Sequence, residues 1–323
     1  MTAFFNAVIP FIPEKLYRFR KLDNNGYSVK SFLDGSITLC KASLFQYKYD
    51  SLVFVDNKRI RDELVKYLKE ALSFVLKDIE HNNPLVKAEK ASRVLYYREC
   101  GLSDQQIVAK IIAEEYADYV ADIERSLKKR EMRFRDSDKT ARIACFTENI
   151  RSKFMWDTYA GGYTGFALEY NLRAFFVKCL HEMRQVYVFP VIYTDTRPDL
   201  TDLEFKHFII EQSLVREEMK VLGPYLRNLP FNLVSPFRPY LYKDRTEYAH
   251  EREWRMLYYD VELTSNYISI PDADCLTGIY YGPDIKKKDE SILQSVANDK
   301  GIQEHRVQLD TENRRFDLSI VDY

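Results

Sequence analysis

Charged residues crowd one short segment of this sequence, Tyr248–Leu257, in which Glu251 and Glu253 are the candidate catalytic groups. Strand alternation would place Glu251, Glu253 and Arg255 on one side. Two carboxylates about 7 Å apart along a strand repel each other unless a cation or a ligand lies between them. Such a pair can stabilise a developing positive charge with one carboxylate and activate a nucleophile with the other. The alternative is a solvated edge strand whose charges form cross-strand salt bridges.

The motifs of the commonest enzyme classes are absent. The sequence contains no G-x-G-x-x-G, G-x-x-x-x-G-K-S/T, H-E-x-x-H or G-x-S-x-G. The glycine cluster Ala160–Gly165 predicts a tight turn before a strand rather than a phosphate loop. The five histidines lie far apart along the chain, so no metal is expected.

Two further patterns point towards nucleic acid. Asp199, followed by Glu218 and Lys220, has the residue types of a metal-dependent nuclease, but Glu218 lies within a helical period where that chemistry needs neighbouring strands. The basic run Lys128–Arg135 falls at the predicted end of a helix. Cations there offset the helix dipole without any partner, and the run is also compatible with a nucleic-acid contact.

Composition restricts the class of protein. The 323 residues are 46% hydrophobic and 30% charged, which predicts a soluble globular chain with a sizeable core. The net charge of -1 gives no overall attraction to nucleic acid or to an anionic membrane. Five widely spaced cysteines fit reduced thiols, and the apolar stretch Ala3–Ile12 is broken by Asn6 and Pro10. We therefore expect a cytoplasmic protein with no membrane association.

Hydrophobic periodicity predicts an α+β protein. Alternating residues predict strands near both ends of the sequence, and a period close to 3.6 predicts three helices over about 56–139. We expect one domain over residues 1–323, with 56–139 as a helical insertion. The predicted strands are 16–20, 36–40, 143–146, 164–170, 186–193, 253–259, 267–270, 276–281 and 305–309.

Four ordered blocks of residues resemble a bacterial family known as domain of unknown function 2971. The blocks are Tyr17-x-Phe19-Arg20; Cys145-Phe146-Thr147-Glu148 with Met155-Trp156-x-x-Tyr159-Ala160 and Gly165–Tyr170; Lys243 with His250–Arg255; and Gly278–Gly282. The chain departs from that family in the segment Phe45–Asp50, where Phe-Asn-Asp-Pro-Phe-Asp is more usual, and in the long insertion.

That family in turn is similar to ADP-ribosyltransferases of the arginine/serine/glutamate class. The resemblance implies an ADP-ribosyltransferase-like core of mixed or antiparallel strands, with NAD as the substrate. It implies that Glu253 stabilises the oxocarbenium-like ribose and that Glu251 orients or deprotonates the acceptor. The implied NAD contacts are Arg18 or Arg20 at the diphosphate, Thr147 at the ribose, Tyr159 or Tyr163 stacked on nicotinamide, and Trp156 as a cofactor wall or core residue.

The leading hypothesis is therefore a NAD-dependent ADP-ribosyltransferase that modifies a nucleic acid or a protein, in the manner of a bacterial toxin or phage-defence effector. An antitoxin or another regulatory protein is a further expected partner. The alternatives are a non-enzymatic module that binds a partner protein and, after it, the metal-dependent nuclease.

Overall fold

The chain divides into two compact units in the computed structural model. The structure describes residues 9–22, 26–45, 47, 49–80, 88–135, 141–206, 235–260, 263–271, 275–312, 314 and 317–322. The sheet unit comprises Met1–Ser51, Ser137–Thr196 and Tyr240–Tyr323, and the helical unit comprises Leu52–Asp136 and Arg197–Pro239. The helical insertion expected over 56–139 thus shares its unit with a second segment, 197–239.

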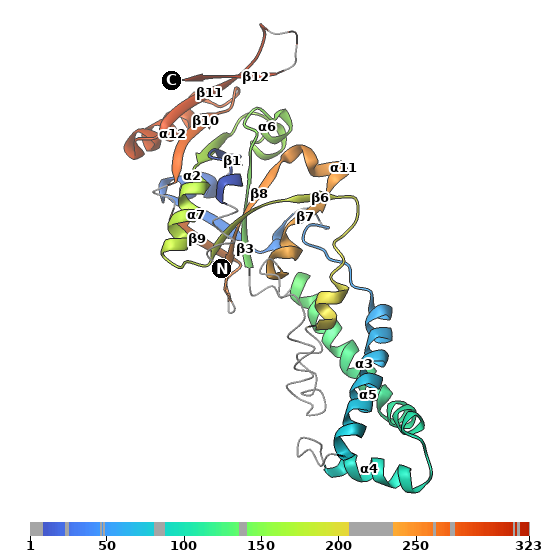
Figure 1. Ribbon diagram of the computed structural model, residues 1–323. Helices are drawn as coiled ribbons and strands as arrows, with labels where there is room; N and C mark the ends of the chain where they lie inside the picture. The colour runs from blue at the N-terminus through green and yellow to red at the C-terminus, as the bar shows by residue number, and fades with distance from the viewer. Residues whose placement is uncertain are drawn as a thin grey trace. The chain divides into compact units, whose positions relative to one another are not determined.

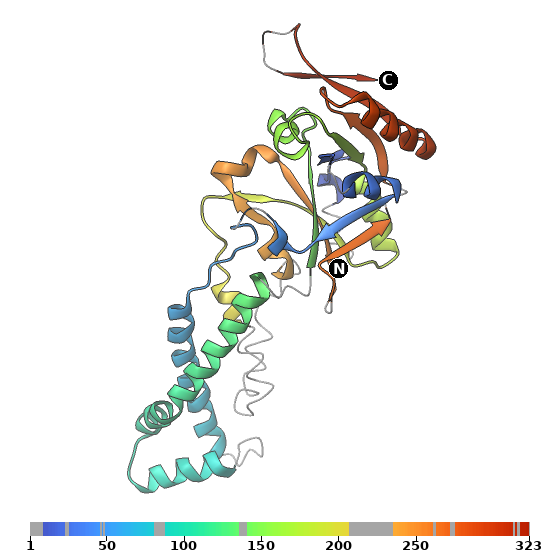
Figure 2. The same ribbon diagram turned by 180° about the vertical axis from the view of Figure 1, so that it is seen from behind.

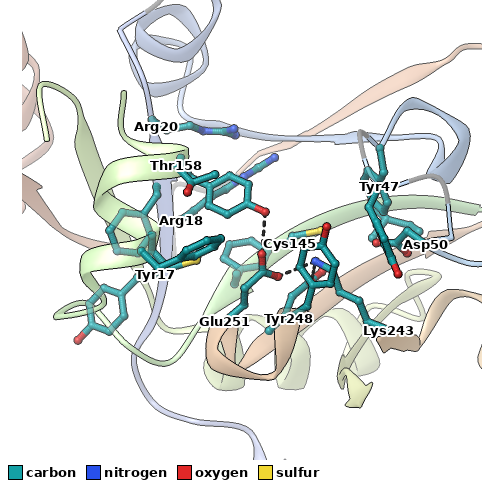
Figure 3. A pocket seen from close by; sticks show the side chains of 18 of the residues that line it. Tyr17, Arg18, Arg20, Tyr47, Asp50, Cys145, Thr158, Lys243, Tyr248 and Glu251 are labelled. Atoms are coloured by element: carbon teal, nitrogen blue, oxygen red, sulfur yellow. Dashed lines mark hydrogen bonds and ion pairs between the residues drawn. The ribbon is translucent and has the colours of Figure 1, made fainter. Parts of the chain in front are cut away.

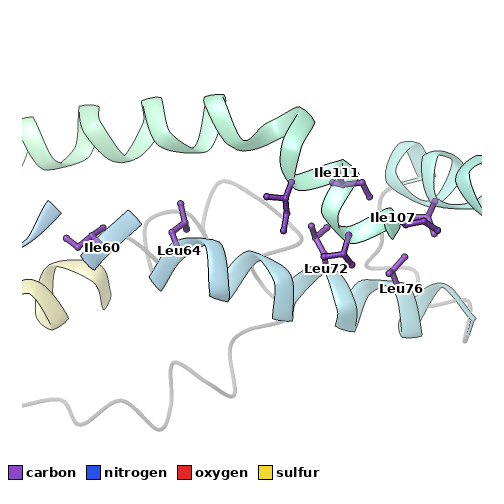
Figure 4. Packing of buried hydrophobic residues seen from close by; sticks show 9 residues of the cluster. Ile60, Leu64, Leu72, Leu76, Ile107 and Ile111 are labelled. Carbon is purple, nitrogen blue, oxygen red and sulfur yellow. The ribbon is translucent and has the colours of Figure 1, made fainter. Parts of the chain in front are cut away.

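The helical unit contains the three predicted helices, α3 (Asn57–Glu80), α4 (Ala88–Glu99) and α5 (Asp104–Arg135). Helices α3 and α5 lie side by side (Figure 2). Apolar residues of all three helices pack in a buried cluster (Figure 4), because residues three or four apart fall on one helix face. The cluster consists of Ile60, Leu64, Leu72, Leu76, Val94, Ile107, Val108, Ile111 and Ile112.

A capping box begins α5 at Ser103. The Ser103 amide donates to Gln106 Oε1 at 2.9 Å, and the Gln106 amide donates to Ser103 Oγ at 3.4 Å. Two otherwise unpaired amides at the start of the helix are satisfied in this way.

The sheet unit is built on a ten-stranded sheet, antiparallel except where β10 pairs with β11 (Figure 1). One run of neighbours is β12-β11-β10-β4-β1-β3-β2-β9, while β8 pairs with β3 and β5 pairs with β8. The strands are β1 (Leu16–Arg20), β2 (Ser36–Cys40), β3 (Ala141–Thr147), β4 (Phe166–Tyr170), β5 (Val186–Pro190), β8 (Glu253–Tyr259), β9 (Tyr267–Pro271), β10 (Leu276–Tyr281), β11 (Gln303–Leu309) and β12 (Leu318–Asp322). The protein is therefore α+β, as expected.

The sheet splits along one edge of β3. Strand β8 pairs with β3 from Ala141 to Thr147 and so occupies one of its edges completely. Strands β1 and β2 share the other edge, β1 through Thr147 and β2 through Ile143. Because β1 and β2 join opposite ends of the same edge, they diverge, and the part of β3 between them faces a gap in the hydrogen-bonded sheet.

Short helices connect and cover these strands. They are η1 (Ile9–Phe11), α2 (Tyr27–Leu33), η2 (Ala42–Leu44), α6 (Lys153–Tyr159), α7 (Leu172–His181), α11 (Arg245–Tyr248), η4 (Ala249–Glu251) and α12 (Lys287–Lys300), with η3 (Ser235–Tyr240) at the boundary between the units. Helix α6 packs through Trp156 against Phe19 of β1, with ring centroids 4.9 Å apart. A small parallel sheet joins β6 (Ile192–Thr194) to β7 (Tyr242–Asp244).

The glycine cluster forms a turn that leads into β4, as predicted. Gly161 and Gly162 have positive φ angles of 65° and 63°, and the Gly165 amide donates to Ala160 O at 2.8 Å. A Cβ on Gly165 would lie 2.2 Å from Arg20 O, so only glycine permits this approach to β1.

The expected strands are found, with one change. The single strand predicted over 186–193 is broken into β5 and β6, which belong to different sheets. The sequence patterns do not predict α2, α6, α11, β7 or β12, which are short or lack a clear hydrophobic period.

Candidate functional site

A cavity of about 520 Å³ lies in the sheet unit where β1 and β2 diverge (Figure 3). Segments far apart in the sequence line it: β1, the residues from β2 to Asp50, β3, α6, and the stretch from Lys243 to Glu253. The volume falls in the range of small-molecule and cofactor sites.

The two acidic side chains come together around a buried lysine. Lys243 Nζ lies 2.5 Å from Glu251 Oε2 and 3.0 Å from Glu253 Oε2. All three side chains are almost completely buried and all three line the cavity. The sequence requires a cation or ligand between the carboxylates, and Lys243 is that cation.

The backbone reaches this arrangement through an interruption of the strand. Asp244 caps α11 by accepting from the Thr246 amide at 2.8 Å, and the chain then makes the 3-10 turn η4. Arg252 follows with φ 47° and ψ 51°, in the left-handed region, and β8 begins at Glu253. Glu251 therefore ends a turn and is not a strand residue, contrary to the alternation expected from the sequence.

Glu253 is also held by Arg255 from the same strand. Arg255 Nε donates to Glu253 Oε1 at 2.7 Å, and its two terminal nitrogens bind Asp50 at 2.8 and 2.6 Å. Burial alone would raise the pKa of Glu253, but the charges of Arg255 and Lys243 outweigh it and lower that pKa to about 2. Glu253 is consequently ionised at neutral pH.

The edge-strand alternative is wrong for this segment. Strand β8 lies between β3 and β5, and its first five residues are buried. Its charges form internal ion pairs rather than solvated cross-strand pairs.

Tyr159 joins the carboxylates from α6. Its hydroxyl donates to Glu251 Oε1 at 2.7 Å, and Tyr159 is one of the residues that line the cavity. Burial and the nearby charge of Glu251 raise the pKa of Tyr159, so the phenol remains protonated and acts as a donor.

Two arginines lie on β1 at the opposite side of the cavity. Arg18 and Arg20 point in the same direction from the strand (Figure 3). Arg18 Nη2 donates to Thr38 O at 2.7 Å, but its Nη1 is buried without a partner in the described part of the chain. Neither guanidinium pairs with a carboxylate among the described residues. Burial and the charge of Arg18 lower the pKa of Arg20 to about 9, which leaves Arg20 positively charged at neutral pH.

Two partly buried guanidiniums without carboxylate partners on one wall of a cavity favour a bound negative charge, which would offset their partial desolvation. An oxyanion such as phosphate or diphosphate has the charge and geometry to bind both. This side of the cavity is therefore suited to bind an anion.

Aromatic rings line much of the remaining wall. Tyr47 and Tyr248 lie with centroids 4.5 Å apart, and Lys243 Nζ lies 4.3 Å from the centre of the Tyr248 ring. Phe154, from α6, contacts His250 at 4.1 Å between centroids. Such rings offer flat apolar surfaces to a planar ligand.

Three predicted NAD contacts do not reach this cavity. Thr147 is fully buried, and its hydroxyl donates to Glu251 O at 2.5 Å and accepts from the Asn149 amide. Trp156 is fully buried, with its indole N–H donating to Ile150 O at 2.7 Å. Tyr163 donates its hydroxyl to Lys153 O at 3.2 Å. These groups position the chain or fill the core, and none lines the cavity.

Sequence reasoning missed two charged residues of the site. Lys243 is one of the residues that carry the family resemblance, but it received no role. Asp50 ends the segment that departs from the family pattern, yet Asp50 and Phe45, its last and first residues, both contact Arg255. No signal in the sequence links Asp50 to Arg255, because the two residues lie 205 positions apart.

The nuclease pattern finds no support among the described residues. No group of three metal-binding side chains occurs among them. Asp199 Oδ1 accepts from the Thr201 amide at 2.8 Å, while Glu218 and Lys220 lie outside the described residues. The basic run Lys128–Arg135 lies at the end of α5, as predicted. Within the described part of the chain, no helix has the length and apolar character needed to cross a membrane.

Comparison with known proteins gives one match, over part of the chain. No curated protein and no solved structure matches the chain, so these comparisons provide no link to ADP-ribosyltransferases. A family model described as "Protein of unknown function (DUF2971)" matches residues 155–256. The chain thus carries a DUF2971 family domain over a segment that contains Lys243, Glu251 and Glu253 but neither of the β1 arginines.

Proposed function

We propose that this protein is a NAD-dependent ADP-ribosyltransferase and that the cavity between β1 and β2 binds NAD. The observation that carries the proposal is the presence, in one cavity, of a carboxylate pair and of two arginines without carboxylate partners.

The charges of the cavity match those of NAD. At the end near β8, the carboxylates of Asp50, Glu251 and Glu253 face the cations of Lys243 and Arg255, which leaves one net negative charge. The arginines give the β1 side two positive charges. NAD carries a cationic nicotinamide ring and a diphosphate of opposite charge, so it would be attracted in one orientation.

Glu253 would stabilise the reacting ribose in that orientation. When the bond between the ribose C1′ and the nicotinamide nitrogen breaks, its electron pair leaves with neutral nicotinamide and positive charge develops on the ribose. A carboxylate already ionised and fixed in place stabilises that charge without reorganisation. The two cations that hold Glu253 keep it in this state.

Glu251 would act on the acceptor. Its carboxylate could orient the attacking group and take its proton as the new bond to C1′ forms. Tyr159 lies beside Glu251 and remains the candidate to stack on nicotinamide, whereas the proposal gives no NAD contact to Thr147, Trp156 or Tyr163, which do not line the cavity. Thr147 would act through the backbone of Glu251.

The split of the sheet supports the proposed likeness to the ADP-ribosyltransferase core. The first strand brings arginines to the gap, β8 brings Glu253, and the turn before it brings Glu251. The acceptor remains a nucleic acid or a protein, and a toxin or phage-defence role under the control of an antitoxin or regulatory protein belongs to the same proposal.

Incubation of the pure protein with NAD tests the activity. We expect release of free nicotinamide and, after addition of a cell lysate, transfer of labelled ADP-ribose from NAD carrying a labelled adenylate. The informative variant is Arg20→Met, because the guanidinium of Arg20 makes no hydrogen bond or ion pair with the described residues that its loss would break. It should weaken NAD binding at least tenfold without lowering the melting temperature.

Arg151→Met is the matched control, since Arg151 is exposed in the same unit and lies away from the cavity lining. It should behave like the wild type. The absence of nicotinamide release together with no rise in melting temperature at millimolar NAD would overturn the proposal and favour the binding-module alternative.

A further inference from the structure

The unassigned residue at the centre of the site is Lys243. Lys243 lies on β7 and is paired with Tyr193 of β6, so the small parallel sheet fixes the position of its backbone. Its ammonium contacts both carboxylates and the face of the Tyr248 ring. The side chain is only 7% exposed, so these groups rather than water solvate the ammonium.

Each carboxylate has one oxygen on Lys243 and the other on a different group. Glu251 Oε1 accepts from Tyr159, and Glu253 Oε1 accepts from Arg255. Glu251 therefore has no cation besides Lys243 among the contacts described, whereas Glu253 retains Arg255. Loss of the ammonium would leave two buried carboxylates side by side with one guanidinium, itself shared with Asp50.

Like charges in a buried site are relieved when one group takes up a proton. The charged and titratable groups that face the carboxylates are Lys243 of β7, Arg255 of β8, Asp50 before the helical unit, Tyr159 of α6, Tyr193 of β6, Tyr248 of α11 and Cys145 of β3. Of these, Lys243 is the cation that contacts both carboxylates, and the tyrosines and the thiol have raised pKa values because of burial and neighbouring charges.

We infer that Lys243 is a positioning residue of the proposed reaction: it holds Glu251 and Glu253 ionised and side by side, so that one can face the ribose while the other faces the acceptor. This inference rests on the proposed function. It assigns Lys243 no contact with NAD, so its loss should reduce kcat far more than it raises KM.

The test compares Lys243→Met with Lys243→Arg, and with Lys288→Met as a control on the exposed face of α12. Nicotinamide release is measured from about pH 3 to pH 9, a range that includes the acid limb set by the carboxylates. In Lys243→Met we expect kcat to fall about a hundredfold with KM within about threefold, and the acid limb of the kcat profile to move up by about one pH unit. Lys243→Arg should recover most of kcat, because a guanidinium can also bridge two carboxylates.

Two outcomes would overturn the inference. One is a Lys243→Met enzyme whose kcat stays within about threefold of the wild type. The other is an equal loss of kcat in the Met and Arg variants with an unchanged pH profile, which would indicate a structural role only.

A second measurement requires no activity. Carboxyl ¹³C NMR titration of glutamate-labelled protein, assigned with Glu251→Gln and Glu253→Gln, follows each carboxylate directly. We expect both to be ionised at pH 6 in the wild type and one to titrate above its wild-type position in Lys243→Met. If the wild type releases no nicotinamide, the proposed function fails, and this titration alone decides whether Lys243 holds the pair ionised.

Discussion

Asp50 and Arg255 are 205 positions apart in the chain and form a buried two-pronged ion pair, in which both carboxylate oxygens bind the guanidinium. The third nitrogen of that guanidinium, Nε, binds Glu253. Asp50 thus orients the Arg255 fork that holds Glu253 at the cavity. The pair joins the segment after β2 to the strand that carries the proposed catalytic carboxylate.

Substitution of Asp50 by Asn should destabilise the sheet unit strongly. It keeps the shape of the side chain but leaves the buried Arg255 without half of its compensating charge, which costs about 3 kcal/mol or more. Urea denaturation followed by tryptophan fluorescence measures the loss. Asp202→Asn is the control, because Asp202 forms an exposed pair with Arg59 and its loss should change stability by about 0.5 kcal/mol or less. Equal effects of the two substitutions would contradict the assigned importance of the buried pair.

The elements that frame the site follow from local patterns in the sequence. Strands β1 and β8 have the bounds that the sequence predicts. The side chains of Glu253 and Arg255 face the same side of β8, as the two-residue period of a strand requires. Residues 16–20 and 253–259 were predicted without error because a two-residue period is visible within a single strand.

The details of the site depend on contacts that no local pattern contains. The pairing of β7 with β6 brings Lys243 to the carboxylates. Asp50 and Arg255 are in contact although the helical insertion lies between them in the sequence. Trp156 shows that residue type alone can be ambiguous, because a tryptophan fits both a cofactor wall and a core position. Its burial against Phe19 shows that it is a core residue.

The ion pairs of Glu253 should make stability depend on acidity. The pKa of Glu253 is lowered from 4.5 to about 2 in the folded protein, so the folded state holds its proton less tightly than the unfolded chain. The resulting stabilisation is present above about pH 4.5, amounts to something on the order of 3 kcal/mol, and is lost as the pH falls towards 2.

Comparison with Glu253→Gln isolates this contribution, because the amide does not titrate. The difference in unfolding free energy between the two proteins should be constant from about pH 7 to pH 5 and should fall by about half by pH 3. Denaturant titrations over that range provide the measurement. A difference that does not vary with pH would show that Glu253 is not held by its cations in the folded state.

Trp156→Phe should affect stability but not ligand binding. The change removes the hydrogen bond to Ile150 O and leaves space beside Phe19, at a cost of about 2 kcal/mol. The rise in melting temperature on addition of NAD should equal that of the wild type, because Trp156 does not line the cavity. Phe154→Leu should give the converse pattern, with little loss of stability and a smaller response to NAD, since Phe154 is 40% exposed and lines the cavity. If Trp156→Phe showed unchanged stability and a smaller rise in melting temperature with NAD, Trp156 would have to be counted among the NAD-binding residues.

Arg252 provides a test of the backbone turn that separates the two carboxylates. Its φ of 47° lies in the left-handed region, where a residue with a Cβ is strained by about 1 kcal/mol or more relative to glycine. Arg252→Gly and Arg252→Ala both remove the ion pair between Arg252 and Glu148, so the difference between them reports the backbone alone. We expect the glycine variant to be more stable than the alanine variant by about 1 kcal/mol, the reverse of the order in a regular strand or helix. Thermal denaturation of the two variants measures this difference. An alanine variant as stable as the glycine variant would mean that the chain can pass from η4 to β8 without the left-handed turn, and the placement of Glu251 beside Glu253 would then need another cause.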